Sequence, residues 1–234
     1  MSWQVPRMWE GGDVWIIGGG PSLTQQFEIP DDIVQRVQSE ELPPSTYSSY
    51  LAAIHDKHVI AVNSGYLLGD WIDMVFFGDK GWWLNNRERL AKFPGLKVSC
   101  HPKVASHEFV TEHIKYVAKD RDHTKGLSPN PGMVSWNLNS GGAAMSVAAN
   151  TGVKRIILLG FDMRLGTRDK QHWHGLYGSA KRGKVNPRKL PFHRHLRGFP
   201  AIAEDAKNRD IEILNACPNS KIDCFRRVSV KELL

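Results

Sequence analysis

Short apolar runs separated by longer polar stretches set the pattern of this chain. Six runs have the length of a buried strand, at residues 13–17, 58–62, 74–77, 96–100, 155–160 and 211–214. Continuous apolar runs of this length are typical of strands that are covered on both faces, as in a parallel sheet. The cleanest is residues 155–160, which we expect at the centre of the core.

Helical patterns stand between these runs. Residues 80–93 have helical spacing and stop at Pro94-Gly95, residues 140–151 form a helix of small residues that begins at Ser140, and a helix follows near residues 198–207. Residues 24–56 contain three prolines and predict a broken helix, and Ser229 with Glu232 forms a capping box for a last short helix. The alternation predicts one Rossmann-like α/β domain over residues 1–234, with a mostly parallel sheet flanked by helices.

Composition narrows the class of protein. Hydrophobic residues make up 41% and charged residues 24%, and no apolar run approaches the length of a membrane span. The start of the chain lacks a signal-peptide pattern, and the three cysteines form no C-x-x-C pair. These features predict a cytoplasmic protein without a disulfide framework. Self-association into a homo-oligomer stays open.

The net charge of +7 indicates an anionic partner. Residues 170–203 hold no Asp or Glu but include Lys181, Arg182 and Arg194 among eight basic side chains. One interpretation is a solvated basic loop. The other is a lid over about residues 164–197 whose cations, Lys181, Arg182 and Arg194, neutralise phosphates.

A glycine-rich turn follows the first strand, with the sequence Gly18-Gly19-Gly20-Pro21-Ser22-Leu23. Its amides, the Ser22 hydroxyl and the start of a helix predict a phosphate site, and the alternative is a turn without a ligand. The turn does not match the dinucleotide-binding motif, because Leu23 stands where that motif has a small residue and no Asp or Glu follows the second strand. The turn is also not a P-loop, because the glycines are not followed by the Gly-Lys-Ser/Thr that the P-loop motif requires.

Polar residues also stand at other predicted strand ends. Asn63 follows the second strand, Ser140 begins the small-residue helix, and Asp162 follows the cleanest strand. Since ligands of such sheets bind at the carboxyl ends of the strands, these three residues are candidates for binding a nucleotide. Asn63 as a turn residue, and Ser140 as a plain helix cap, are the structural alternatives.

Histidines and acids supply candidate chemistry. His172, His174, His193 and His195 lie in the basic segment, and any of them could take a proton from an acceptor hydroxyl. Asp79, at the end of the third strand, could hold Mg²⁺ together with Asp162, or it could cap the next helix.

The ordered motifs resemble bacterial sialyltransferases that use CMP-sialic acid without a metal. The shared pieces are residues 14–23 (a strand, then Gly-Gly-Gly-Pro-Ser-Leu), Val62-Asn63, Asn139-Ser140-Gly141, Leu159-Gly160-Phe161-Asp162 and residues 213–220. The glycine turn is also similar to that of proteins related to 6-hydroxymethylpterin diphosphokinase.

The resemblance implies roles for particular residues. Gly20, Ser22, Asn63 and Ser140 would hold the nucleotide part of the donor, and His193 or His195 would act as the base. The family has tyrosines near the leaving phosphate. The comparable stretch of this chain has His172, Trp173, His174 and Tyr177, so the difference from the family concerns which sugar is bound rather than the nucleotide-binding fold.

The leading hypothesis is a glycosyltransferase that needs no cofactor and moves a sugar from a nucleotide-sugar to a hydroxyl. Gly19, Gly20, Ser22, Asn63, Ser140 and Asp162 would bind the donor, and His193, else His195 or His174, would be the base. A Mg²⁺-dependent diphosphokinase-like transferase is one alternative. Another is a nucleic-acid-binding or nucleic-acid-modifying protein that stacks bases on Trp173, Tyr177 and Phe192. The acceptor is a glycan or, in a mixed case, a nucleic acid.

Overall fold

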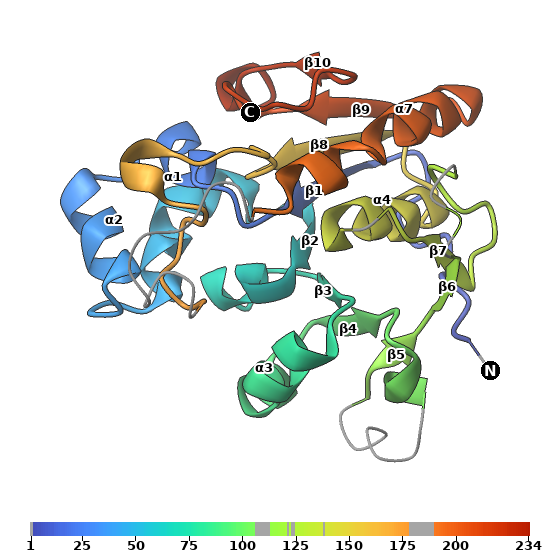
Figure 1. The fold of residues 1–234 in the computed structure, drawn as a ribbon, viewed down its shortest axis with the longest axis horizontal. Helices are drawn as coiled ribbons and strands as arrows, with labels where there is room; N and C mark the ends of the chain where they lie inside the picture. The colour runs from blue at the N-terminus through green and yellow to red at the C-terminus, as the bar shows by residue number, and fades with distance from the viewer. Residues whose placement is uncertain (1, 106–112, 121, 123–124, 138, 178–189) are drawn as a thin grey trace.

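The computed structural model describes residues 2–105, 113–120, 122, 125–137, 139–177 and 190–234. At its centre is an eight-stranded sheet with the order β10-β9-β8-β1-β2-β3-β4-β5, and every pairing in it is parallel (Figure 1). A separate parallel pair is formed by β6 and β7. The strand bounds are β1 Asp13–Ile17, β2 His58–Val62, β3 Met74–Phe77, β4 Leu96–Ser99, β5 Lys115–Tyr116, β6 Ala118–Asp120, β7 Met133–Ser135, β8 Arg155–Leu159, β9 Glu212–Asn215 and β10 Arg226–Arg227.

The strand order reverses between β1 and β8. From β1 the chain adds β2 to β5 on one side, and it then places β8, β9 and β10 on the other side. Ile17 pairs with Leu159, so the two central strands end side by side. In an open parallel sheet, the crevice at such a reversal is where ligands bind. The glycine turn follows β1 and Asp162 follows β8, so both lie at this reversal.

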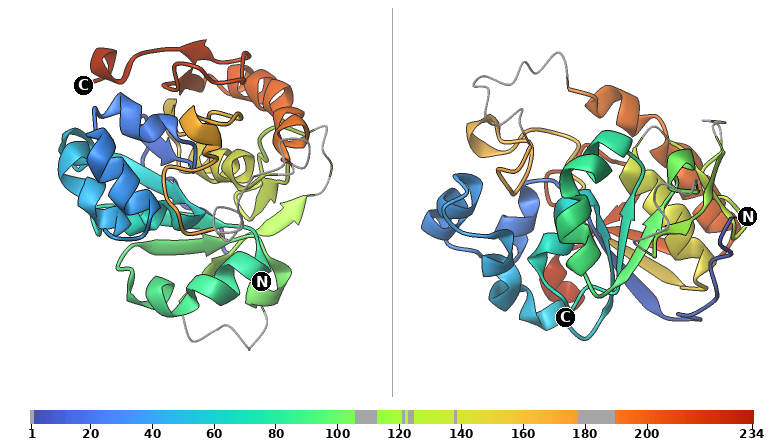
Figure 2. Two further views of the ribbon diagram at one scale, coloured as in Figure 1. Left: turned by 60° about the vertical axis from the view of Figure 1, so that its left-hand side comes forward. Right: turned by 90° about the horizontal axis from the view of Figure 1, so that it is seen from below.

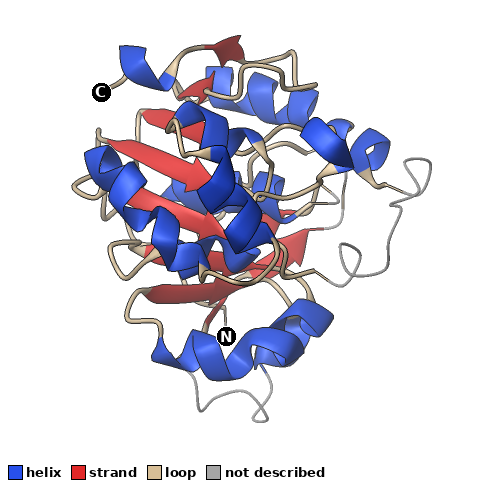
Figure 3. Ribbon diagram, turned by 90° about the vertical axis from the view of Figure 1, so that its left-hand side faces the viewer, coloured by secondary structure: helices blue, strands red, loops and turns tan. Residues whose placement is uncertain are grey.

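Two helical layers cover the sheet, as Figure 2 and Figure 3 show. One face carries α4 (Ser140–Asn150) and α7 (Phe199–Asn208). The other face carries α1 (Ser22–Gln26), α2 (Asp31–Gln38), α3 (Lys80–Lys92) and the 3-10 helices η1 (Pro44–Ile54), η2 (Asn63–Leu68) and η7 (Val230–Glu232). Three more short helices are η3 (Pro102–Ala105), η5 (Thr167–Asp169) and α6 (Phe192–Leu196).

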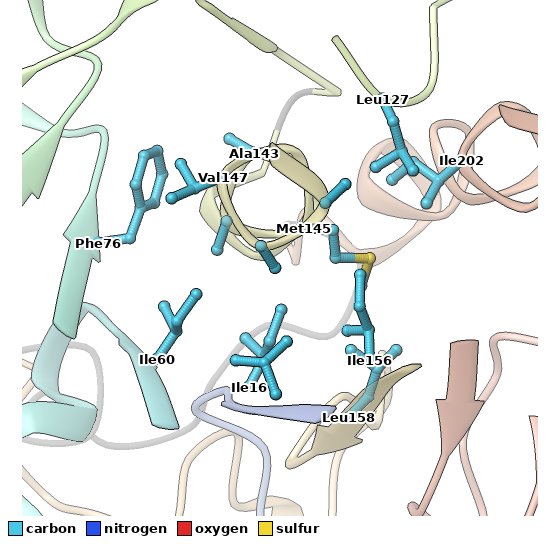
Figure 4. Close-up of a cluster of buried hydrophobic side chains, with 14 of the residues drawn as sticks. Ile16, Ile60, Phe76, Leu127, Ala143, Met145, Val147, Ile156, Leu158 and Ile202 are labelled. Atoms are coloured by element: carbon cyan, nitrogen blue, oxygen red, sulfur yellow. The ribbon is translucent and has the colours of Figure 1, made fainter. Parts of the chain in front are cut away.

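The core follows the period of two along each strand. Ile16 packs under α4, and its neighbour Ile17 packs under the helices of the opposite face. Figure 4 shows α4 lying over Ile16, Ile60 and Ile156. Small residues on α4, such as Ala143, allow its backbone to come close to the strands.

The N-terminal segment runs from the edge strand β5 to the pole of the sheet where the strands begin. Trp3 N–H donates to Tyr116 (2.6 Å), Val5 N–H to Pro131 (3.0 Å) and Trp9 N–H to Thr151 (3.0 Å). The Trp9 ring stacks on His58, the first residue of β2, at 4.8 Å between ring centroids. This segment therefore stabilises the pole opposite the strand carboxyl ends.

The predicted α/β class with a mostly parallel sheet is confirmed, and all six predicted strands are present. Four short strands, β5, β6, β7 and β10, were not predicted, because two or three residues carry no readable periodicity. The broken helix predicted over residues 24–56 is three separate pieces, α1, α2 and η1. The capping box at Ser229 and Glu232 is formed. Among the described residues, no helix has both the length and the apolar character that crossing a bilayer requires.

Candidate active site

The glycine turn is packed against the end of β8. Gly18 N–H donates to Leu159 O (2.7 Å), and Gly20 N–H donates to Gly160 O (2.8 Å). A Cβ on Gly20 would lie 1.9 Å from Asp162 Oδ2, so no side chain fits there. The third residue of the turn has to be glycine because the Asp162 carboxylate occupies that space.

Asp162 binds the start of α1. Its Oδ2 accepts from Ser22 Oγ (2.9 Å) and from Ser22 N–H (3.3 Å), and the side chain is almost fully buried. Burial raises the pKa of this carboxyl, although the bonds from Ser22 act in the opposite direction. The Gly20 amide and both Ser22 donors, which sequence reasoning assigned to a phosphate, thus have partners within the protein. Among the described residues, the Gly19 N–H donates no hydrogen bond.

Residues 172–177 cover the turn with aromatic rings. The Trp173 indole N–H donates to Gly18 O (2.9 Å) and its backbone N–H to Gly19 O (3.1 Å), while the whole residue is buried. His172 Nδ1 lies 3.2 Å from Gly19 O. Because Trp173 is part of the core, its ring is not exposed for stacking on a nucleic-acid base, as one alternative required.

His172 and His174 are parallel rings 5.2 Å apart, and Tyr177 meets both edge-on. Burial lowers the pKa of His172 to about 4 and that of His174 well below its usual value. Both rings are therefore neutral near pH 7. His174 is only 4% exposed, which keeps an acceptor hydroxyl away from its ring in this conformation.

At the end of β2, Asn63 adopts a left-handed backbone conformation with φ of 52°. Its Oδ1 is buried and has no hydrogen-bond partner among the described residues. Next to it, Ser64 Oγ donates to Tyr177 Oη and accepts from Trp82 Nε1, both at 3.2 Å. Ser64 and Trp82 were not predicted as site residues, because in the sequence they look like a turn residue and a core residue.

A cavity of about 780 Å³ opens beside Asn63. Its walls are η2, α3 and the residues Leu176 and Tyr177. Asn63 and Asp79 are thus two predicted site residues that line this cavity. The glycine turn connects to the same cavity through His172 and Tyr177.

The two acids proposed for Mg²⁺ are held apart by the sheet. Asp79 follows β3 and caps α3 by accepting from Trp82 N–H (2.8 Å), whereas Asp162 follows β8. β1 and β2 lie between these strands, which separates the two strand ends by about 14 Å. Asp79 and Asp162 therefore cannot share one ion. Within the described part of the chain, no group of three His, Cys, Asp or Glu side chains is placed to hold a metal.

The N-terminus of α4 also reaches this edge of the sheet. Asn139, rather than the predicted Ser140, caps the helix, since Asn139 Oδ1 accepts from Gly142 N–H (2.6 Å). Its Nδ2 donates to His195 O (3.4 Å) and so fixes α6 beside α4. Ser140 is the first residue of the helix itself.

α6 carries the remaining candidates. His193 and Arg194 are exposed, while His195 is half-buried, and burial lowers the pKa of His195 to about 4. Lys181 and Arg182 lie outside the described residues. α6 and residues 172–177 therefore present the candidate histidines from two separate segments.

Comparison with known proteins adds information on the fold. No protein-family model matches the chain, and no curated protein matches it by sequence. Among solved structures, the chain is similar to the sialyltransferase CstII from Campylobacter jejuni, with 18% identity over 94% of this chain and 86% of that one and a TM-score of 0.53. The sialyltransferase Cst-I from the same organism gives 16% identity, 94% and 80% coverage and a TM-score of 0.51.

A third structure, the MAf glycosyltransferase from Magnetospirillum magneticum AMB-1, matches all of this chain but only 36% of its own length, with 13% identity and a TM-score of 0.61. The fold expected from the motifs is thereby confirmed. The chain shares the parallel α/β architecture of these glycosyltransferases.

Proposed function

We propose that the protein is a glycosyltransferase that moves a sugar from a nucleotide-activated donor to a hydroxyl acceptor. One observation carries the proposal. In a fold shared with sialyltransferases, the pairing of β1 with β2 places the glycine turn and Asn63 at the same edge of the sheet. Asn63 lines a cavity of about 780 Å³, and its buried Oδ1 has no partner among the described residues. CstII has been solved with cytidine-5'-monophosphate and with CMP-3FNeuAc, which makes CMP-activated sugars the first donors to test.

Donor binding is assigned to groups that can still accept a partner. The Gly19 N–H would donate to a phosphate of the nucleotide-sugar, and Asn63 Oδ1 would accept a hydrogen bond from it. Ser140, at the start of α4, would also bind the nucleotide-sugar. Gly20, Ser22 and Asp162 form the mutual contacts that fix the turn's shape. Arg194, together with Lys181 and Arg182, would neutralise the leaving phosphate.

His193 is the base in this proposal, because it is exposed on α6 whereas His174 is buried. The acceptor hydroxyl gives its proton to the imidazole as its oxygen bonds to the anomeric carbon. At the same time the bond from the anomeric carbon to the phosphate oxygen breaks, and the nucleotide leaves with the electron pair. The basic side chains bind the charge that develops on this oxygen.

A ligand screen tests donor binding. Thermal unfolding would be followed with CMP-, UDP-, GDP- and ADP-sugars, each with and without Mg²⁺. At a ligand concentration of 100 Kd, a true donor stabilises the folded state by about 2.7 kcal/mol and raises Tm. We expect this for a CMP-sugar. If none of the four nucleotide classes shifts Tm, the proposed function is wrong.

Kinetics of a matched pair of variants test the base. His193→Asn should lower kcat by about 10²- to 10⁴-fold and leave the donor Kd from calorimetry unchanged. His113→Asn, an exposed histidine beside the edge strand β5, should keep wild-type values. Equal losses of kcat and donor affinity in His193→Asn would instead assign His193 to binding.

A further inference from the structure

A second cavity adjoins the glycine turn. It has a volume of about 260 Å³, and its walls are α1, α2 and the segment that contains η5. Pro21 of the turn is part of the wall, and a Cβ on Gly166 would lie 2.6 Å from the Pro21 ring, so this segment packs directly on the turn. Among the described residues, none lines both this cavity and the 780 Å³ cavity beside Asn63. The two are therefore separate spaces on either side of the turn's cover.

One polar face of α2 lines this second cavity. Asp31, Gln35 and Gln38 follow one another at intervals of four and three residues, so they lie on the same side of the helix. Val37, on another side, is buried in the core. The core contact thus fixes which face of α2 the cavity receives.

Six polar side chains of the wall have no partner within the described part of the chain. They are Gln25, Asp31, Gln35, Gln38, Thr167 and Lys170, none of which makes a side-chain hydrogen bond or an ion pair there. Four of the six are exposed and two, Gln38 and Lys170, are half-buried. Three segments that are distant in the sequence therefore place accessible donors and acceptors around one small space.

The chemistry of the wall fits a neutral sugar. Each of the three glutamine carboxamides offers both donors and an acceptor, which is what a sugar hydroxyl requires. The charged groups of the described lining are one carboxylate, Asp31, and one ammonium group, Lys170, so no excess charge selects an anion. Pro21 and Val34 add apolar surface for the C–H groups of a sugar ring. Cavities for drug-sized ligands have roughly 300–1,000 Å³, so this smaller one suits a single sugar ring rather than a nucleotide.

The loop over residues 163–171 connects this cavity to the candidate active site. Asp162, directly before the loop, accepts from Ser22 of the glycine turn. Thr167 and Lys170 of the loop line the cavity. A sugar in the cavity thus lies beside the turn, but the described lining contains neither the proposed base nor a proposed donor-binding residue. This is the position of a sugar that neighbours the reacting one in an acceptor chain.

We propose that this cavity is an acceptor subsite that binds a neutral sugar of a glycan, with Gln25, Asp31 and Gln35 bonding to its hydroxyl groups. The inference rests on the proposed function and adds the class of acceptor to it, a neutral glycan rather than a nucleic acid. An acceptor subsite has to be occupied together with the donor site. The donor nucleotide therefore leaves the sugar in place.

Saturation-transfer NMR with simple glycosides tests the inference on the whole chain. Methyl glucoside and methyl galactoside are the neutral probes, methyl glucuronide is the anionic comparison, and calorimetry measures the Kd of CMP. We expect the neutral probes to receive at least about threefold more transfer than the glucuronide, because the wall has no excess cation to bind a carboxylate. The transfer should persist when CMP is added at about ten times its Kd.

Two adjacent aspartates supply a matched pair of variants. Asp31 lines the cavity and Asp32 does not, although both are exposed in the first turn of α2. Asp31→Ala and Gln35→Ala should each reduce transfer to the neutral probes at least about threefold, because each removes a hydrogen-bonding group from the wall. Asp32→Ala should leave the transfer unchanged. The Kd of CMP should be the same in all three variants.

Each outcome decides one of the two proposals. If CMP binds but the neutral glycosides do not, or if Asp31→Ala and Asp32→Ala have equal effects, the inference is overturned and the transferase proposal stands. Displacement of the glycosides by CMP would likewise overturn the acceptor subsite alone. If the glycosides bind through Asp31 and no nucleotide-sugar binds, the transferase proposal is wrong and the acceptor role falls with it. A preference for the glucuronide, or a single-stranded oligonucleotide whose binding Gln35→Ala weakens, would overturn the neutral sugar class.

Discussion

Burial sets the protonation state of single residues in this site. The carboxyl of Asp162 has a raised pKa, and the imidazoles of His172 and His174 have lowered pKa values, with loss of solvent as the largest cause for all three. Loss of solvent disfavours the charged form of both kinds of group. These buried groups therefore offer few charges of their own, which is why our proposal assigns neutralisation of a bound phosphate to basic side chains such as Arg194.

The lowered histidine pKa values make stability depend on pH. His172 takes up a proton at 6.5 when unfolded but only at about 4 when folded, so the unfolded state binds more protons between these values. Stability should thus fall as the pH drops from 7 to 5, by about 2 kcal/mol from His172 alone. Urea unfolding at pH 7 and at pH 5 measures this difference in the free energy of unfolding.

A substitution isolates that contribution. His172→Gln removes the titrating ring, so the stability difference between pH 7 and pH 5 should shrink by about the same 2 kcal/mol. His58→Gln is the control, since His58 lies at the opposite end of β2. If the wild-type protein has equal stability at the two pH values, the burial argument for His172 is wrong.

At the scale of elements, α4 links the core to the site. Ten of its eleven residues are buried, and its N-terminus emerges where the strands end. Asn139 both caps this helix and holds α6 through His195 O. The position of the exposed His193 relative to the sheet therefore depends in part on this amide side chain, together with the packing of Leu196 on the core.

Substitutions at adjacent positions test this link. Asn139→Ala removes the cap and should lower the free energy of unfolding by about 1–2 kcal/mol. Ser140→Ala should change it by less than about 0.5 kcal/mol, because Ser140 makes no cap hydrogen bond. Chemical denaturation measures both. A larger loss in Ser140→Ala than in Asn139→Ala would contradict the observed cap.

At the scale of the whole molecule, the two poles of the sheet have separate roles. The N-terminal segment, with Val5 and Trp9 buried, binds across the pole where the strands begin. The glycine turn, Asn63, Asp162 and the cavity lie at the opposite pole. Stability and ligand binding should therefore be affected by different substitutions.

Trp9→Ala tests this separation. It removes a buried indole and its stacking on His58, which should cost about 3 kcal/mol or more of stability. The affinity for a nucleotide, measured by calorimetry well below Tm, should stay within about twofold of the wild type, because Trp9 lies at the far pole. Asn63→Gly, which accepts the φ of 52° at this position, should show the reverse, with weakened binding and little loss of stability. Equal effects of both variants on affinity would contradict the two-pole description.

Local sequence was sufficient to find the glycine turn, Asn63 and Asp162, because each directly follows an apolar run. It was not sufficient to assign their partners. Ser22 binds Asp162 across 140 positions of sequence, and Trp173 donates to Gly18 across 155. Such contacts depend on which strands become neighbours, and no local pattern encodes that order.

The sequence by itself determined the class of fold and the edge of the sheet that carries the polar residues, since apolar periodicity fixes the strands and parallel strands end at one edge. Only the tertiary structure decided which polar groups have partners. Packing β8 beside β1 pairs Ser22 with Asp162 and separates Asp79 from Asp162. It also leaves the buried Oδ1 of Asn63 without a hydrogen-bond partner among the described residues. The physical reason is that hydrogen bonding and burial depend on distances in space, which the chain sets only when it is folded.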